Sequence, residues 1–455
     1  MKYLIIGNSI AGVSAARIIR RHDKNCSITI ITKEAYPFYS KCLLPYYLRN
    51  EVGFDETILA DEHFYKENYI SLIKRRHVTK VFTDKNKVAL DNNEEITYNK
   101  LLIATGASPI QIGSGPNIFS LRSFEDVEKI KAAALIPLTP PLVKGGWGDY
   151  KKAVVIGAGP MGMKVAYGLK GLGCEVTVLE AGKQVFTRIL SKRAAFILSK
   201  HLINKGIEIM TNCRFLSYDE NNQPPFNSPL TKGGDRGVKV GKGGFSDKKF
   251  VTFEEGNITK DIEADFVVMA IGVKPNADFL KDSGVKTNAG VIVDSYMRTN
   301  IDNIYAAGDA AEALDPITNR YTINATWPSA VLEGETAGYN MAGIETQIKG
   351  NVSSNSIQFF GLSFVSAGLL ESDSLPIEEE IIDEDIPKNL FKRLVFLDNR
   401  LVGLEFLGDV QGAGIYLDIL KGQKDTSPFR SRLSDMDFGY GKILKFAGTE
   451  DRFFI

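Results

Sequence analysis

Residues 153–162 read Ala-Val-Val-Ile-Gly-Ala-Gly-Pro-Met-Gly, an apolar run followed by the spacing GxGxxG. The apolar run predicts a buried strand, and the glycines predict a tight turn at the start of a helix that continues to about Leu172. A second predicted strand follows from Glu175 to Leu179. This order of elements predicts a βαβ unit that binds a dinucleotide, with the pyrophosphate held by backbone N–H groups at the helix start.

An acidic residue ends this unit. Glu180 directly follows the second strand, where a carboxylate accepts a hydrogen bond from the 2′-hydroxyl of an adenosine ribose. Its charge repels a 2′-phosphate, and no arginine follows within the next few residues. The sequence therefore predicts that NADH is preferred over NADPH.

A second glycine motif stands near the N-terminus. Residues 2–6 predict a strand, residues 7–12 read Gly-Asn-Ser-Ile-Ala-Gly, and a helix is expected to follow. Glu34 stands just beyond the next predicted strand, where an acid can bond a ribose hydroxyl. This GxSxxG turn is a weak signal on its own, because Ser9 replaces the middle glycine and leaves less room for a phosphate.

Two further predicted strands end in residues that suit a nucleotide site. Residues 101–109 read Leu-Leu-Ile-Ala-Thr-Gly-Ala-Ser-Pro, a strand that ends in ATGxxP. Residues 304–311 read Ile-Tyr-Ala-Ala-Gly-Asp-Ala-Ala, a strand that ends in Gly-Asp before small residues. We expect this second strand to set Asp309 beside a helix N-terminus, and the small residues to permit close approach of a cofactor.

A single cysteine is the candidate redox residue. Residues 39–47 read Tyr-Ser-Lys-Cys-Leu-Leu-Pro-Tyr-Tyr and predict one or two helical turns after a strand. Cys42 at the start of such a segment, next to Lys41, is expected to have a lowered thiol pKa and to act as a nucleophile. The other interpretation is that Cys42 is a buried small hydrophobic residue, as most free cysteines are. The four cysteines are widely spaced and predict neither a disulfide framework nor a metal site.

The composition is ordinary for a globular protein, with 455 residues of which 44% are hydrophobic and 24% charged. This length predicts two or three domains. The 55 basic and 55 acidic residues balance, which argues against binding to nucleic acid or to a membrane surface. No apolar run reaches the roughly 18 residues of a membrane span, and the N-terminus predicts a strand rather than a signal peptide. We expect a cytoplasmic protein.

Two low-complexity stretches, residues 137–149 and 221–249, share the sequence Pro-Leu-x-Lys-Gly-Gly. We expect both to be surface-loop insertions, because long loops are tolerated at a small entropic cost. A polar linker is then expected at residues 345–356, before an α+β module without dinucleotide glycines. Its expected elements are strands at residues 358–364, 391–397 and 401–407 and a helix near residues 414–420.

With these motifs, the chain resembles the FAD-dependent pyridine nucleotide-disulfide oxidoreductases, the glutathione-reductase-like flavoproteins, over nearly its whole length. The resemblance implies an α/β fold with two Rossmann-like dinucleotide-binding domains, for FAD and NAD, and a C-terminal α+β dimerisation domain. A homodimer with FAD and NADH as cofactors is therefore expected. The implied FAD-binding domain consists of residues 1–114 and 284–345. The implied NAD-binding domain is residues 115–283, and the implied dimerisation domain is residues 346–455.

In that family the first glycine turn and the Gly-Asp motif bind FAD, and the second glycine turn binds NAD(P)H. The implied FAD contacts, with residues beside them, are Gly7, Ser9, Ile10, Ala11, Gly12, Glu34, Lys41, Ala104, Thr105, Gly106, Gly308, Asp309 and Ala310. The implied NADH contacts, with residues beside them, are Gly157, Gly159, Pro160, Met161, Gly162, Glu180 and Gly272. Arg20 and Arg21 resemble a basic pair of the coenzyme A-disulfide reductase group that could touch coenzyme A phosphates, although arginines at a helix end are usually just solvated.

The single cysteine indicates a branch of this family. Position 47 is tyrosine, so the CxxxxC dithiol is missing, and residues 40–46 resemble the SxxxCxLPY pattern of the coenzyme A-disulfide reductase group. Ile10 stands where the peroxidase group carries a histidine, which disfavours peroxide reduction.

We therefore predict an enzyme that passes hydride from NADH through FAD to a sulfur acceptor at Cys42, such as coenzyme A disulfide or a polysulfide. Three alternatives remain open. They are an NADH oxidase that reduces oxygen, a reductase of a small electron-carrier protein, and a non-enzymatic NADH-sensing flavoprotein.

Overall fold

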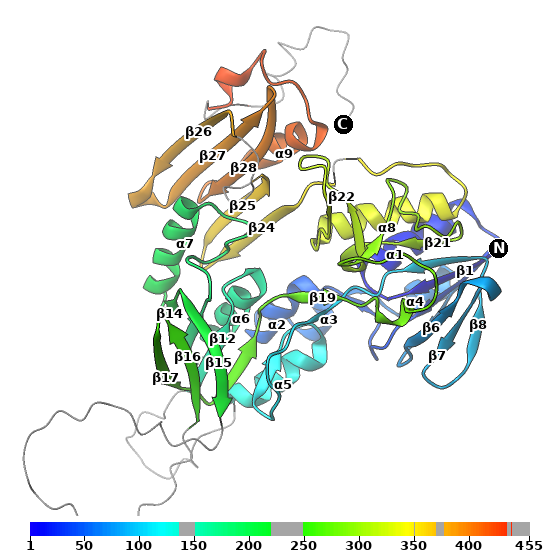
Figure 1. The fold of residues 1–455 in the computed structure, drawn as a ribbon, viewed down its shortest axis with the longest axis horizontal. Coiled ribbons are helices and arrows are strands. Elements are labelled where there is room, and N and C mark those ends of the chain that lie inside the picture. Colours follow the sequence, from blue (N-terminus) through cyan, green and yellow to red (C-terminus); the bar gives the residue numbers. More distant parts are fainter. Residues whose placement is uncertain (136–150, 220–248, 350, 370–376, 435–437, 439–455) are drawn as a thin grey trace, which may run out of the picture.

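The computed structural model describes residues 1–135, 151–219, 249–349, 351–369, 377–434 and 438. It contains three units, two built on parallel sheets and one on an antiparallel sheet (Figure 1). The two predicted insertions lie outside the described residues, apart from Lys249. No helix in the described part of the chain is long and apolar enough to cross a membrane.

The first unit is built on a five-stranded parallel sheet, in which β-branched and other apolar residues fill the strands on both faces. In sheet order its strands are β21 (Ile304–Ala306), β9 (Lys100–Ile103), β1 (Lys2–Ile6), β2 (Ser27–Ile31) and β5 (Ile70–Ile73). The late strand β21 pairs with β9, so the chain returns to this unit after forming the second one.

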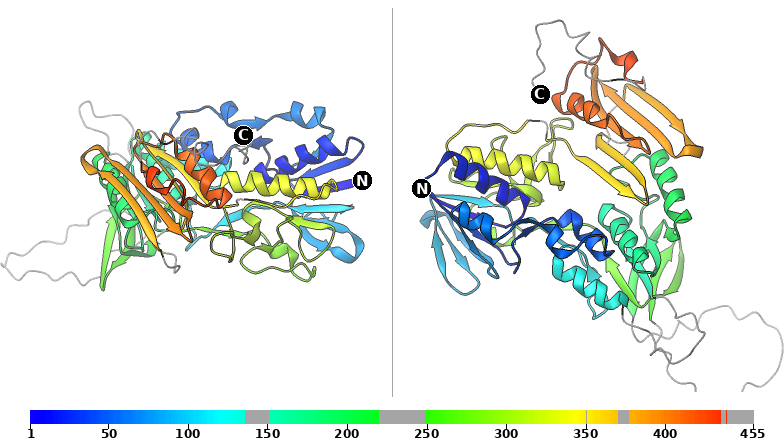
Figure 2. Two further views of the ribbon diagram at one scale, coloured as in Figure 1. Left: turned by 90° about the horizontal axis from the view of Figure 1, so that it is seen from above. Right: turned by 180° about the vertical axis from the view of Figure 1, so that it is seen from behind.

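Two helices, α1 (Ile10–His22) and α8 (Trp327–Met341), pack side by side against this sheet (Figure 2). Glycines let them approach closely, because a Cβ on Gly334 would lie 2.3 Å from the Ala11 carbonyl oxygen. Smaller elements complete the unit. They are α4 (Glu62–Glu67), β6 (Val78–Phe82), β7 (Lys87–Leu90), β8 (Glu95–Thr97), β20 (Val291–Ile292), β22 (Ala311–Leu314) and β23 (Tyr321–Thr322).

The segment between β2 and α4 leaves the first unit and packs on the core of the second. Its elements are β3 (Phe38–Tyr39), α2 (Leu44–Leu48), α3 (Phe54–Thr57) and β4 (Ile58–Ala60).

The second unit repeats the design of the first. In sheet order its parallel strands are β11 (Ile118–Ser120), β18 (Phe266–Met269), β12 (Lys152–Ile156), β13 (Glu175–Leu179) and β14 (Ile207–Met210). Its other elements are α5 (Phe124–Leu135), α6 (Pro160–Gly171), α7 (Lys192–Asn204), β15 (Cys213–Asp219), β16 (Phe250–Glu255) and β17 (Ile258–Glu263). The antiparallel strands β10 (Ala107–Pro109) and β19 (Val273–Pro275) connect the two units. The predicted fold class, with two Rossmann-like units, is confirmed.

The third unit is an antiparallel sheet with one helix. In sheet order its elements are β24 (Ser354–Phe359), β25 (Leu362–Gly368), β28 (Arg400–Leu407), β27 (Leu390–Leu397) and β26 (Glu379–Asp385), with α9 (Ala413–Gly422) against the sheet. The single strand predicted at residues 358–364 is wrong. The left-handed residues Phe360 (φ 47°) and Gly361 (φ 85°) form a tight turn there between β24 and β25.

Candidate active site

The main candidate site is a cavity of about 570 Å³ at the carboxyl ends of the first parallel sheet. Strands β1, β2, β9 and β21 all end at its wall, which is where open parallel sheets bind their ligands. Of the predicted residues, those at the wall are Gly7, Ser9, Ile10, Ala11, Glu34, Lys41, Cys42, Ala104, Thr105, Gly106, Met161, Gly308 and Asp309. The structure therefore brings the first glycine turn, the ATG segment, the Gly-Asp motif and Cys42 together.

The first glycine turn has no room for larger residues. Gly7 has φ 123°, and a Cβ there would lie 2.0 Å from the Ala104 carbonyl oxygen. A Cβ on Gly12 would lie 2.1 Å from the Gly7 carbonyl oxygen. These contacts fold the turn tightly onto the start of the 13-residue helix α1, whose N-terminal N–H groups suit a diphosphate.

Asn8 is a site residue that the sequence prediction missed. Its Oδ1 accepts a hydrogen bond from the Tyr65 hydroxyl at 2.8 Å, and this contact fixes the side-chain amide at the cavity wall. Its Nδ2 is buried and has no hydrogen-bond partner. An unpaired buried donor is costly, so this atom suits an acceptor oxygen of a bound ligand. The cavity size, the glycine turn and this donor together fit FAD.

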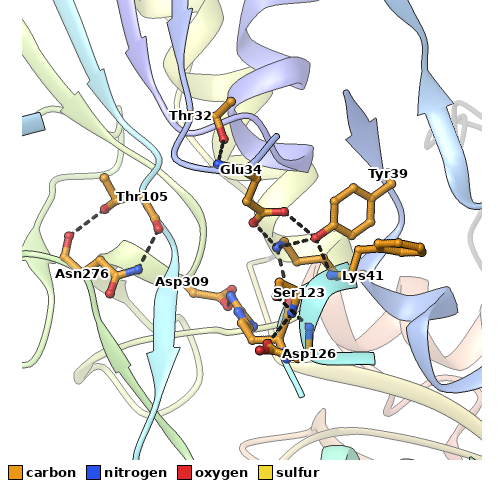
Figure 3. Close-up of polar contacts among 11 residues, drawn as sticks. Thr32, Glu34, Tyr39, Lys41, Thr105, Ser123, Asp126, Asn276 and Asp309 are labelled. Atoms are coloured by element: carbon orange, nitrogen blue, oxygen red, sulfur yellow. Dashed lines mark hydrogen bonds and ion pairs between the residues drawn. The ribbon is translucent and has the colours of Figure 1, made fainter. Parts of the chain in front are cut away.

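Glu34 lies in a network with the segment that carries Cys42 (Figure 3). Its carboxylate accepts a hydrogen bond from the Tyr39 hydroxyl and pairs with Lys41 Nζ at 2.6 Å. Burial alone would raise the pKa of Glu34, but Lys41, Tyr39 and Lys33 together outweigh it and hold that pKa below its ordinary value. The acid is thus ionised, and it lies at the wall of the cavity.

Cys42 lies in a 3₁₀ turn, Lys41–Leu43, directly before the five-residue helix α2. It is solvent-exposed, whereas Cys26, Cys174 and Cys213 are buried, so the reading of Cys42 as a buried hydrophobic residue is wrong. The predicted lowering of its thiol pKa is also wrong. Although its side chain reaches solvent, the surrounding protein partly desolvates the Cys42 thiol. This desolvation and the Asp309 carboxylate raise the pKa of Cys42, while Arg122 and Lys164 oppose them.

Two physical reasons explain this correction. Lys41 pairs with Glu34, so its charge is already compensated. The helical segment at Cys42 is too short to supply a substantial dipole, because the macrodipole is a sum over aligned peptide units.

Asp309 forms an ion pair with Arg122, whose Nη2 lies 2.6 Å from Asp309 Oδ2. Residues 308–310 form a single 3₁₀ turn that leads into β22. The helix N-terminus expected beside Asp309 is that of α1, because a Cβ on the preceding Gly308 would lie 3.1 Å from Ala11 Cβ. Gly308 N donates to Glu333 Oε2 at 2.7 Å. Glu333 is buried in α8, and this burial raises its pKa to about 8. Sequence reasoning missed both Arg122 and Glu333, which reach Asp309 and Gly308 from distant segments.

Thr105 couples the cavity to the connection between the units (Figure 3). Its hydroxyl donates to the Asn276 carbonyl at 2.7 Å, and Asn276 Nδ2 donates to the Thr105 carbonyl at 3.0 Å. The two bonds join the start of β10 to the end of β19 and so hold the ATG segment in place. Gly272, just before β19, has φ 121°.

In the second glycine turn, too, the first and last glycines have no room for a Cβ. A Cβ on Gly157 would lie 2.5 Å from the Ala270 carbonyl oxygen, and one on Gly162 would lie 1.9 Å from the Gly157 carbonyl oxygen. At Gly159, by contrast, nothing lies within 4 Å of that position, which leaves space for a phosphate. Pro160 is the first residue of α6, a position where its missing N–H costs nothing.

Glu180 holds this turn through two hydrogen bonds to backbone N–H groups. Its Oε2 accepts from Ala158 N at 2.6 Å and its Oε1 accepts from Gly182 N at 2.7 Å. The carboxylate therefore stands beside the glycine turn, in the place expected for reading a ribose. These residues suit the adenosine end of NADH, and Met161 at the start of α6 extends to the wall of the main cavity.

The basic pair at the end of α1 lies elsewhere. Arg20 is buried and donates to the carbonyl oxygens of Asp23, Lys24, Cys26, Asn68 and Tyr69. Its guanidinium is thus used to close the α1–β2 loop, which corrects its assignment as a substrate contact. Arg21 is exposed on the same helix end, and the residues that line the main cavity do not include it.

Comparisons with known proteins agree with this geometry. The family model described as pyridine nucleotide-disulphide oxidoreductase matches residues 1–334. The chain is 30% identical over 454 residues to the NADH-dependent phenylglyoxylate dehydrogenase subunit epsilon of Aromatoleum evansii, covering 97% of each chain. It is 32% identical over 358 residues to an NADH oxidase of Methanocaldococcus jannaschii, covering 76% of this chain and 71% of that protein.

A solved structure extends the comparison to the fold. The NAD-dependent persulfide reductase from A. fulgidus superposes with a TM-score of 0.78 at 25% identity. The superposition covers 97% of this chain and 80% of that one. All three units of the chain therefore have counterparts in a known reductase.

Proposed function

This chain belongs to the pyridine nucleotide-disulphide oxidoreductase family, and we propose that it reduces a disulfide or polysulfide at Cys42. Membership confirms the resemblance found in the sequence and the class of enzyme, an FAD-dependent NAD(P)H oxidoreductase. The proposal concerns the acceptor, the role of Cys42 and the preference for NADH.

One observation carries the proposal. Cys42 is the exposed cysteine of the described chain, and it opens into the same cavity as the first glycine turn and the Gly-Asp motif. Met161 brings the NAD-binding unit to that cavity as well. A thiol at this position is accessible to a sulfur compound and adjacent to the space that fits FAD.

The proposed reaction needs an external thiol partner, because no second cysteine is exposed in the described chain. The Cys42 thiolate attacks one sulfur of a disulfide RSSR′, forms the mixed disulfide Cys42–S–SR and releases R′S⁻. FAD, when bound, supplies the electron pair of NADH that cleaves this mixed disulfide. The balanced sum is NADH + H⁺ + RSSR′ → NAD⁺ + RSH + R′SH.

The proposal is tested by anaerobic NADH oxidation with a panel of disulfides and polysulfide. We expect acceptor-dependent turnover that falls by orders of magnitude in Cys42→Ser, while NADH still reduces the flavin in the variant. The matched control is Cys174→Ser, because the Cys174 thiol is buried away from the cavity. Oxygen-dependent NADH loss without any sulfur acceptor would instead support an NADH oxidase, the activity named for the Methanocaldococcus relative.

A second candidate is a reductase that exchanges electrons with a protein partner. It is favoured by the relative from Aromatoleum, which matches over 97% of both chains and is named as a subunit of a larger dehydrogenase. The raised pKa of Cys42 also suits a cysteine that takes no part in turnover. Full activity of Cys42→Ser with a protein electron carrier would decide for this candidate.

In either case we propose a homodimer formed through the C-terminal unit, which analytical ultracentrifugation of the holoenzyme tests.

A further inference from the structure

The helix that follows Cys42 is docked on the second unit. Cys42 lies in the turn Lys41–Leu43, and the Leu44 N–H donates to the Lys41 carbonyl, so this turn continues directly into α2. The side chains of Leu44 and Leu48 are fully buried in the core that α5 and α6 share with α2. A displacement of α2 against these helices therefore displaces the thiol as well.

Polar contacts hold α2 from two sides. The Tyr47 hydroxyl donates to Glu128 Oε1 of α5 at 2.9 Å. From α6, Lys164 Nζ donates to the Tyr46 hydroxyl at 2.7 Å. Both contacts are made by residues after the cysteine and reach helices of the second unit, so the second unit fixes the segment that carries the thiol.

Helix α6 presents bare backbone to α2 at two positions. A Cβ on Gly168 would lie 2.8 Å from Leu48 Cδ2 and 3.2 Å from the Pro45 carbonyl oxygen. A Cβ on Gly171 would lie 2.1 Å from Arg49 Cγ. Glycine inside a helix is unfavourable relative to alanine, because it loses more backbone freedom on folding. The close approach of α2 explains why glycine stands at position 168 nevertheless.

The same helix begins at the second glycine turn. Pro160 is the first residue of α6, Met161 lines the main cavity, and Gly168 stands about two helical turns further on. One rigid element thus carries both the turn expected to bind NADH and the surface on which the helix after Cys42 rests.

We propose that the second unit places the Cys42 thiol at the wall of the main cavity, with Gly168 as the positioning residue. Because Gly168 has no side chain, α2 comes close to α6, and the position of α2 fixes that of the turn with Cys42. This inference rests on the proposed function, since it concerns the thiol that attacks the acceptor. Gly168 itself touches neither cofactor nor substrate.

The test is Gly168→Ala in the FAD-loaded protein. The added methyl must push α2 away, because Leu48 is buried and the Pro45 oxygen belongs to the backbone. We expect disulfide turnover to fall about tenfold or more, because a misplacement of about 1 Å can cost about 100-fold. The long-wavelength charge-transfer absorbance of a thiolate beside oxidised flavin, read at alkaline pH, should weaken. NADH should reduce the flavin at the wild-type rate, because the second glycine turn is unchanged.

Two variants serve as controls. Gly414→Ala, in α9, should leave band and turnover unchanged, because nothing lies within 4 Å of its Cβ position. In Gly168→Ala/Leu48→Ala the missing leucine side chain makes room for the new methyl, and the band should return towards its wild-type intensity. If Gly168→Ala fails to fold, the double variant is compared with Leu48→Ala alone. There the cavity left behind loosens α2, so the band should be weaker than in the double variant.

The outcomes separate this inference from the proposed function. A full band and full turnover in Gly168→Ala would overturn the inference, and so would a double variant no better than Leu48→Ala. Slower reduction of the flavin by NADH in Gly168→Ala would mean that α6 has moved in place of α2, which also overturns it. A wild-type protein without the band, or full disulfide turnover by Cys42→Ser, would instead overturn the proposed function.

Discussion

The glycine turns at residues 7–12 and 157–162 have nearly the same backbone but different surroundings. In both, the first glycine has a positive φ, and a Cβ on the first or last glycine would collide with a carbonyl oxygen. The acids differ. Glu180 is bonded to backbone N–H groups of its own turn region, whereas Glu34 is held by the side chains of Tyr39 and Lys41.

This difference shows how each nucleotide site is connected to the rest of the molecule. The second turn is a self-contained unit, because its acid is held within the same βαβ segment. The site around the first turn depends on distant segments. Tyr65 fixes Asn8 within the turn, and Glu333 accepts from Gly308 in the neighbouring Gly-Asp motif. The Glu34 network also includes the residue before Cys42. The cavity that fits FAD is therefore coupled to the segment that carries Cys42. The acid of the second turn is bonded only within its own unit, although Met161 of that turn lines the same cavity.

The largest expected effect comes from adding a methyl group to the first turn. In Gly7→Ala the Cβ would lie 2.0 Å from a backbone oxygen at a φ of 123°, so the turn must rebuild. We expect loss of flavin binding and destabilisation by at least about 3 kcal/mol, measured by flavin content and denaturant unfolding. Gly159→Ala is the matched control, because its Cβ meets open space. It should keep the flavin and raise only the KM for NADH.

Glu333, which accepts from Gly308 in the Gly-Asp motif, gives the FAD-site unit a pH dependence. Its folded pKa of about 8 exceeds the ordinary carboxyl value of about 4.3, so the folded protein prefers the protonated acid. Its contribution to stability is full below about pH 4 and is lost as pH rises towards 8. Glu333→Gln mimics the protonated form. Its stability relative to wild type should rise by roughly 2–3 kcal/mol between pH 5 and pH 7, measured by urea unfolding. A constant difference across this range would contradict the prediction.

Features that depend on neighbouring residues could be predicted from the sequence, whereas contacts between distant segments could not. The second turn and its acid were predictable because they depend on neighbouring residues. The cap of α5 is equally local, since Ser123 N donates to Asp126 Oδ2 and Asp126 N donates to Ser123 Oγ. The contacts of Arg122 with Asp309 and of Glu333 with Gly308 join segments far apart in the chain, and no local pattern marks them.

The wrong predictions near Cys42 have the same origin. Lys41 is adjacent to Cys42 in sequence, but its choice of Glu34 as partner depends on how the chain folds back. The small residues after Asp309 form the strand β22. Local rules thus predict which elements exist, and tertiary contacts decide the charges around the thiol.

A substitution in the second glycine turn, which we expect to bind NADH, should change coenzyme preference without changing flavin binding. Glu180→Ala removes the acid expected to read the ribose 2′-hydroxyl and should erode the preference for NADH by about 1–3 kcal/mol. The ratio of kcat/KM for NADH and NADPH measures this effect. Flavin content should stay at the wild-type level, because Glu180 bonds only within the second unit. A wild-type protein that prefers NADPH would contradict the assignment.

The smallest expected effect concerns Asn8, and its sign distinguishes a ligand contact from a structural one. The unpaired Asn8 Nδ2 is unfavourable without a ligand and favourable once an acceptor oxygen occupies the cavity. Asn8→Ala should therefore weaken FAD binding by about 1 kcal/mol, roughly fivefold, without lowering the stability of the flavin-free protein by a similar amount. The Tyr65 hydroxyl complicates this comparison, because it donates to Asn8 Oδ1 and would lose its acceptor. The measurement is therefore made in a Tyr65→Phe background, where that loss is already present. Equal destabilisation of the flavin-free and flavin-bound forms in this background would mean that Asn8 only supports the turn, and that the donors for the diphosphate come from the backbone of α1 alone.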